Sequence, residues 1–160
     1  MTTNKVNPQY SPWFRLDEPA CKCTIDSRPA AAVAITKGQA LHDDGSGFVT
    51  NTVTAFAATF VGIAVEDCDN SAGAAGDLQV LVYLPSTQAR FWVPNVVAGT
   101  VAARTDVGEI CDLETAKGID VTDNTVVAWG FYVDDIDIST KALAANSGGF
   151  CLGRLLPQPQ

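Results

Sequence analysis

The segment Phe60-Val61-Gly62-Ile63-Ala64-Val65-Glu66-Asp67-Cys68-Asp69 occurs a second time, in altered form, as Ala128-Trp129-Gly130-Phe131-Tyr132-Val133-Asp134-Asp135-Ile136-Asp137. The two segments align without gaps, and the glycine, the valine and two aspartates are identical. Shorter matches flank them: Gly38-Gln39-Ala40-Leu41 resembles Gly108-Glu109-Ile110-Cys111 upstream, and Gly76-Asp77-Leu78 resembles Gly148-Gly149-Phe150 downstream. Three matches in the same order predict two repeated halves, about residues 31–95 and 99–157.

Short runs of β-branched and aromatic residues alternate with Gly, Asp and Asn turns from residue 31 onward, which is typical of strands. The expected strands are Ala32–Thr36, Phe48–Thr52, Phe60–Glu66, Leu78–Leu84, Ala89–Val93, Val126–Val133 and Gly149–Leu155. Helix is expected only as single turns at Thr54–Thr59 and Lys141–Ala145. Two repeated halves can close a β-barrel or sandwich and so limit exposed edges. We therefore predict an all-β domain over residues 29–160.

The first 28 residues differ from the rest. Prolines at 8, 12 and 19, and another at 29, prevent a helix and favour extended backbone. This pattern predicts an extended N-terminal arm over residues 1–28. Its apolar side chains are candidates for contact with a partner or a neighbouring subunit: Tyr10, Trp13, Phe14 and Leu16. The alternative is that these aromatic residues fold back onto their own domain.

The composition narrows the classes of partner. The net charge is −8, with 18 acidic and 10 basic residues, and no Lys/Arg cluster occurs, so neither nucleic acid nor an anionic membrane is an expected partner. Only 18% of the residues are charged, against about 25% in typical soluble domains. This shortfall is consistent with a surface partly covered by partners, although a large core would also produce it.

The five cysteines, Cys21, Cys23, Cys68, Cys111 and Cys151, form an odd and irregularly spaced set. The simplest interpretation is a set of mostly reduced structural thiols in a protein made in the cytosol. The polar start of the sequence shows no secretory signal pattern, and the longest apolar runs are too short to span a bilayer.

No catalytic set stands out. His42 is the single histidine and precedes Asp43-Asp44-Gly45, which is more simply a turn between strands. Cys21-Lys22-Cys23 lacks the second ligand pair of a zinc site. The pairs Asp67/Asp69 and Asp135/Asp137 leave calcium open, but turn formation explains them as well. Trp92 and Trp129 could bind sugars or partners but are more often core residues. The expectation is a protein that is not an enzyme and has no cofactor.

The order Gly38-Gln39-Ala40-Leu41, Val61-Gly62-Ile63-Ala64 and Ala75-Gly76-Asp77-Leu78-Gln79-Val80 resembles that of small decoration (cement) proteins of tailed-phage capsids. The resemblance covers about residues 31–95, with an echo in the second half. It implies a β-barrel or β-tulip fold and a homotrimer that binds the major capsid protein on the outer surface of the virion. It also implies an N-terminal arm that adds to capsid strands, with head stabilisation as the function.

Two other classes remain open from the sequence. One is a carbohydrate- or receptor-binding β-module of a phage tail or surface protein, which a cluster of exposed aromatic residues would favour. The other is a small trimeric enzyme of β-fold, which would need polar catalytic groups brought together between subunits; the single histidine argues against it.

Overall fold

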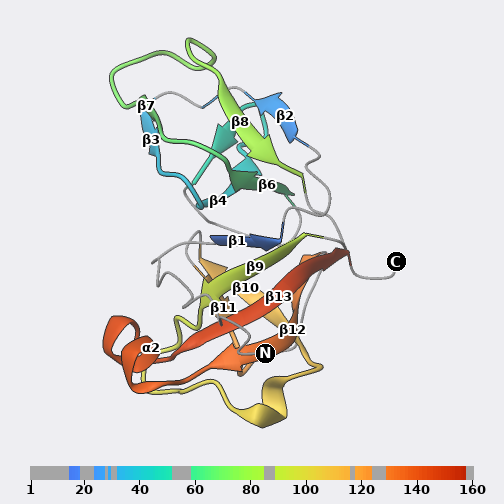
Figure 1. Ribbon diagram of the computed structural model, residues 1–160. Coiled ribbons are helices and arrows are strands. Elements are labelled where there is room, and N and C mark those ends of the chain that lie inside the picture. Colours follow the sequence, from blue (N-terminus) through green and yellow to red (C-terminus); the bar gives the residue numbers. More distant parts are fainter. Residues whose placement is uncertain are drawn as a thin grey trace.

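The computed structural model describes residues 15–18, 24–27, 29, 32–51, 59–84, 89–115, 118–123 and 129–157. Strands dominate these ranges, so the predicted all-β class is confirmed. Figure 1 shows the strands in two lobes, one above the other. The lobes correspond to two stretches of sequence, which we call unit I (strands β2 to β8) and unit II (strands β9 to β13).

Unit I contains a five-stranded sheet in the order β2-β8-β6-β4-β5. Its strands are β2 (Thr24–Ser27), β4 (Ala40–Asp43), β5 (Val49–Thr50), β6 (Phe60–Ala64) and β8 (Val80–Tyr83). A separate pair joins β3 (Val33–Ile35) to β7 (Cys68–Asn70). The sheet curls far enough that Pro29, just after β2, makes a parallel bridge to Val49 in β5. Unit I is therefore barrel-like.

Unit II repeats this arrangement in the order β9-β13-β12-β10-β11. Its strands are β9 (Arg90–Pro94), β10 (Ile110–Thr115), β11 (Gly118–Asp120), β12 (Trp129–Asp137) and β13 (Phe150–Pro157). Asn95, just after β9, makes a parallel bridge to Ile119 in β11, as Pro29 does to Val49 in unit I. The 3₁₀ turn η1 (Arg104–Asp106) precedes β10, and helix α2 (Thr140–Ala145) joins β12 to β13. The helical turn predicted at Lys141–Ala145 is thus confirmed, whereas residues 54–58 lie outside the described ranges.

The hydrogen bonds at equivalent positions also repeat. The Gly38 amide donates to the Ala64 carbonyl at 2.8 Å, and the Gly108 amide donates to the Val133 carbonyl at 2.8 Å. Both glycines have positive φ angles, 86° and 95°, a conformation that glycine adopts without a steric penalty. The glycine turns identified in the sequence therefore begin the same strand in both units.

The pairing register corrects the sequence alignment by one residue. Leu41 pairs with Gly62 in unit I, and Cys111 pairs with Phe131 in unit II, so Gly62 corresponds to Phe131 and not to Gly130. The half boundaries also differ from those predicted, because β9 is the first strand of unit II and does not end the first half. The offset between equivalent residues is therefore not constant. It is 66 residues from Thr24 in β2 to Arg90 in β9, which lie opposite Tyr83 and Arg154. It is 70 residues from Leu41 in β4 to Cys111 in β10.

A steric exchange between strands explains why Gly62 and Gly130 align in the sequence but are not equivalent in the structure. A Cβ on Gly62 would lie 2.1 Å from the Tyr83 carbonyl oxygen and 2.8 Å from Val82. In unit II the glycine is on the opposite strand, where a Cβ on Gly153 would lie 2.0 Å from the Tyr132 carbonyl oxygen and 2.6 Å from Phe131. Since Val82 corresponds to Gly153, the small and the large residue have exchanged strands.

The buried apolar residues of the described ranges form two clusters. One lies within unit I and comprises Ile35, Leu41, Val49, Ala64, Cys68, Val80 and Val82. The other forms the core of unit II, including Phe91, Leu113, Phe131, Val133 and Leu155, and extends into unit I through Ala40, Phe60 and Ile63. Because adjacent residues of a strand face opposite sides, β4 and β6 contribute alternate side chains to both clusters. The two units therefore share one continuous apolar joint.

Candidate functional site

The N-terminal part of the chain adds a strand to unit II. Strand β1 (Arg15–Glu18) pairs antiparallel with β9, with Arg15 opposite Trp92 and Leu16 opposite Phe91. It occupies the edge of β9 that faces away from β13, and it lies beside the joint in Figure 1. The two described segments of the predicted arm, Arg15–Glu18 and Thr24–Ser27, are therefore extended, and each is a strand of one of the sheets. Tyr10, Trp13 and Phe14 lie outside the described residues, as does the side chain of Leu16.

One carboxylate fixes β1 on this edge. Asp17 accepts a hydrogen bond from the Trp92 indole at 3.1 Å and contacts the Arg90 guanidinium at 3.5 Å. The side chains of Arg90 and Asp17 are about one-third exposed, so solvent weakens the ion pair. Trp92 is only partly buried and uses its polar edge to hold β1, so it is not a wholly buried core residue. The side chain of Trp129 is outside the described set.

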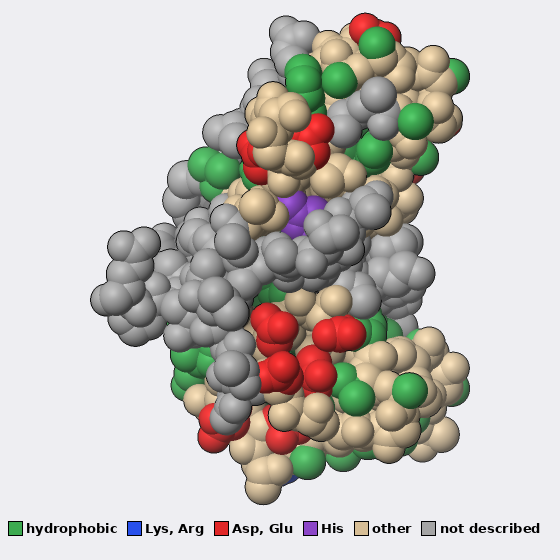
Figure 2. All heavy atoms as spheres, turned by 180° about the vertical axis from the view of Figure 1, so that it is seen from behind, with side chains coloured by type: hydrophobic (Ala, Val, Ile, Leu, Met, Phe, Trp, Pro, Cys, Tyr) green, Lys and Arg blue, Asp and Glu red, His purple; other side chains and the backbone are tan. Residues whose placement is uncertain are grey.

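His42 lies deep beside the joint and is only 3% exposed. It is visible between the two lobes in Figure 2. Burial lowers the pKa of its imidazole. The following residues form the predicted turn: Asp43 accepts from the Gly45 amide at 2.6 Å, and Asp44 accepts from the Ser46 amide at 2.8 Å. Both aspartates are thus engaged with backbone, as turn-forming carboxylates are.

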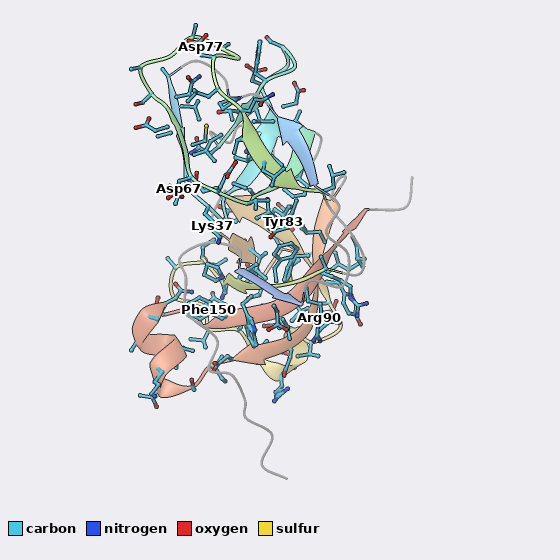
Figure 3. All side chains as sticks on the ribbon, turned by 45° about the horizontal axis from the view of Figure 1, so that its top comes forward. Lys37, Asp67, Asp77, Tyr83, Arg90 and Phe150 are labelled. Carbon is cyan, nitrogen blue, oxygen red and sulfur yellow. The ribbon has the colours of Figure 1, made fainter. Side chains whose placement is uncertain are left out.

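One member of each acidic pair, Asp69 or Asp137, has the same turn-forming role. Asp69 and Asp137 each accept from the backbone amide two residues ahead, at 3.0 and 2.9 Å. Asp67 accepts from the Lys37 amide at 2.7 Å, and these two residues lie together at the border of unit I in Figure 3. Asp135 pairs with Arg104 at 2.8 Å on an exposed surface. Within the described ranges, no group of three or more His, Cys, Asp or Glu side chains is arranged to hold a metal ion.

Three cysteines, Cys68, Cys111 and Cys151, are free and buried, and Cys21 and Cys23 fall outside the described ranges. Burial raises the pKa of the Cys111 thiol to about 12, and nearby carboxylates, Asp106 first among them, raise it further. The pKa of Cys151 is raised in the same way, mainly by burial. Both thiols are therefore protonated at neutral pH and poor nucleophiles. They serve as small core residues.

Acidic side chains gather on one face of unit II, below His42 in Figure 2. The hairpin of β10 and β11 carries Asp112 and Asp120, and Asp123 follows it. Burial raises the pKa of Asp112, and the charges of Asp123 and Asp120 raise it further. Asp112 occupies the position that His42 has in unit I, because the two residues pair with Asp120 and Thr50 respectively. Unit II thus has a carboxylate, that of Asp112, where unit I has the buried imidazole of His42.

The candidate residues that the structure describes therefore hold a strand edge, form turns or lie in the core. The sequence did not predict strand β1 or the contacts of Asp17, because a four-residue strand among prolines leaves little periodicity to detect. The joint was not predicted either. No protein-family model, curated protein or solved structure matches this chain. Among the helices that the structure describes, none has the length and apolar character needed to cross a membrane.

Proposed function

We propose that this chain is a structural decoration protein, which binds the outer surface of a viral capsid as a homotrimer and stabilises the shell by bridging capsomers. The observation that carries the proposal is β1, an N-terminal strand that adds to the edge of a sheet through backbone pairing. Strand addition of this kind is a general way for an extended segment to bind a β-protein. An arm that adds strands in this manner would supply the attachment.

The chemistry of the described residues agrees with a mechanical role. The His42 side chain is buried at the joint, the thiols of Cys111 and Cys151 are held protonated, and the aspartate pairs fix turns or surface ion pairs. In the proposal, their contacts stabilise the two units. In this proposal Tyr10, Trp13, Phe14 and Leu16 contact the major capsid protein or a neighbouring subunit. Neither nucleic acid, a membrane nor a cofactor takes part.

The test is immunogold labelling of intact phage particles with an antibody against this chain. Labelled outer surfaces and release of the chain only on particle disruption support the proposal. Particles that lack the chain, or that contain it only inside, overturn it. The protein would be made in the host cytoplasm and reside on the virion.

The arm is tested by truncation, and the structure sets where to cut. Removal of residues 1–14 keeps β1, whereas removal of residues 1–18 also removes Asp17 and its bonds to unit II. Capsid occupancy is measured at fixed protein concentration for both truncations and the full chain. The shorter truncation should stay folded and lose occupancy. Unchanged occupancy would show that residues 1–14 do not attach the chain.

A further inference from the structure

The order of strands along the chain separates β1 from the rest of its sheet. Strand β1 pairs with β9 of unit II, yet the next strand in the sequence, β2, belongs to the sheet of unit I. Residues 24–83, from the start of β2 to the end of β8, come between the two paired strands. The pairing of β1 with β9 therefore closes a long loop, and closing a long loop costs more conformational entropy than closing a short one.

The ladder that β1 forms is short and interrupted. Strand β1 has four residues and comes first in the strand order of its sheet, and Figure 1 shows it lying along β9 between the two lobes. The register shifts between Leu16 and Glu18, so Asp17 is the extra residue of a β-bulge and lies outside the ladder. Short, interrupted ladders near a chain end are among the parts of a fold that open locally at the lowest free-energy cost.

The side chains of β9 specify which segment fits its edge. Trp92 donates its indole N–H to Asp17 at 3.1 Å, and the Arg90 guanidinium lies 3.5 Å from the same carboxylate. Trp92 and Arg90 are two residues apart on one strand, so both side chains face the same side of the sheet. A fitting segment is therefore extended, antiparallel to β9 and carries a carboxylate at this place. A second copy of the chain offers such a segment, because its own Arg15–Glu18 has the same residues.

We infer that β1 is an exchangeable strap: Arg15–Glu18 of one copy pairs with β9 of another copy, in the register that it has here within one chain. Each contact broken within a chain is formed again between chains, so the exchange has a low cost, as in domain swapping. Five residues, 19–23, separate β1 from β2, and the chain from Glu18 to Thr24 spans at most about 20 Å. The exchange therefore places unit I of one copy beside unit II of the next, in a pair of copies or a closed ring of three.

The experiment divides a charge exchange between two full-length variants, studied in solution without any capsid, so its outcome does not depend on the proposed function. Asp17→Arg places two guanidinium groups together, and Arg90→Asp places two carboxylates together, so each variant holds its own β1 less well. In a mixture, β1 of the first variant meets the changed edge of the second, and β1 of the second meets the unchanged edge of the first. Both exchanged contacts then join opposite charges, and only exchange between chains provides them.

Sedimentation velocity and native mass spectrometry measure the association. The mixture should form a complex of the two variants with a dissociation constant about tenfold below that of either variant alone. The matched control is a mixture of Arg104→Asp and Asp135→Arg, which makes the same charge changes in an exposed ion pair within unit II and should form no mixed complex.

Two further measurements cover loss of folding. Asp17→Arg and Arg90→Asp combined in one chain should melt closer to the wild type than either single variant, because the opposite charges then meet within the chain. A single variant that is unfolded alone should regain its strand signal in circular dichroism when the two variants are mixed. A mixture of the two strap variants that stays monomeric overturns the inference, as does a control mixture that associates equally well.

Discussion

Gly153 provides a direct test of how the two units pack. It lies buried in β13, and a Cβ there would lie 2.0 Å from the Tyr132 carbonyl oxygen and 2.6 Å from a ring carbon of Phe131. A side-chain ring can shift by rotation about its χ angles, whereas a backbone carbonyl cannot. Tyr132 lies opposite Arg154 in the ladder that joins β12 to β13, so its carbonyl moves only if strand pairing is disturbed. The change Gly153→Ala should therefore destabilise the protein although alanine suits an extended backbone.

The magnitude follows from two costs. An extra methyl group in a packed interior costs typically about 1–3 kcal/mol. Weakening one backbone hydrogen bond adds about 0.5–1.5 kcal/mol. We expect Gly153→Ala to lower the free energy of unfolding by about 2–4 kcal/mol. At about 2–4 °C per kcal/mol for a chain of this size, the midpoint of thermal unfolding should fall by about 5–15 °C.

Urea denaturation followed by circular dichroism measures the change, and Gly99→Ala is the control. Gly99 has a φ angle of 80° and open space where its Cβ would be, so alanine costs only the unfavourable backbone conformation, about 1–2 kcal/mol. A smaller loss for Gly153→Ala than for Gly99→Ala would refute the steric argument. A double-mutant cycle with Phe131→Leu should show coupling of about 0.5–1 kcal/mol, because the smaller side chain gives the methyl group space.

Three further predictions concern buried polar groups. Cys111 and Cys151 should resist alkylation at pH 8 in the native protein and react after unfolding, as peptide mapping by mass spectrometry would show, because burial raises both pKa values. The pKa of His42 is lowered in the folded protein, so the unfolded chain binds the proton more readily. The free energy of unfolding should therefore fall as the pH decreases below about 6.5. Urea titrations at several pH values should show a steeper fall for the wild type than for His42→Asn. Asn95→Asp should cost about 2–4 kcal/mol by thermal melting, because the Asn95 amide donates to the carbonyls of Thr100 and Gly148 and a carboxylate cannot; equal stability would contradict this.

The sequence predicted strands best where apolar residues are frequent and turn residues stand next to the run. The runs around β6, β8 and β13 indicated strands because they are mostly apolar and each has a glycine within it or shortly before it. Strand β10 was missed although Cys111 and Leu113 alternate with Asp112 and Glu114, because the acidic residues resemble a turn. The repeat was recognised, but its register was not, since a glycine is needed only once in each close pair of strands and either strand can carry it.

The candidate site depended on information that a single sequence does not contain. The contact that holds β1 in place joins Asp17 to Trp92, which is 75 residues away in the sequence. Likewise, the residues around His42 in the sequence do not indicate that its side chain is only 3% exposed. Local patterns identify turns and strands, whereas these contacts arise only when two distant segments are packed together.

The joint also shows how the repeated units diverged in role. Ala40 and Ile63, a cross-strand pair of unit I, are fully buried against unit II. The equivalent pair in unit II, Ile110 and Tyr132, is only partly buried.

The Arg154 guanidinium lies over the Tyr132 ring of that second pair, 5.3 Å from the ring centre, and forms an ion pair with Asp134. A cation over an aromatic ring tolerates water better than two apolar side chains do. The same backbone position thus became an apolar joint in one unit and a polar surface in the other.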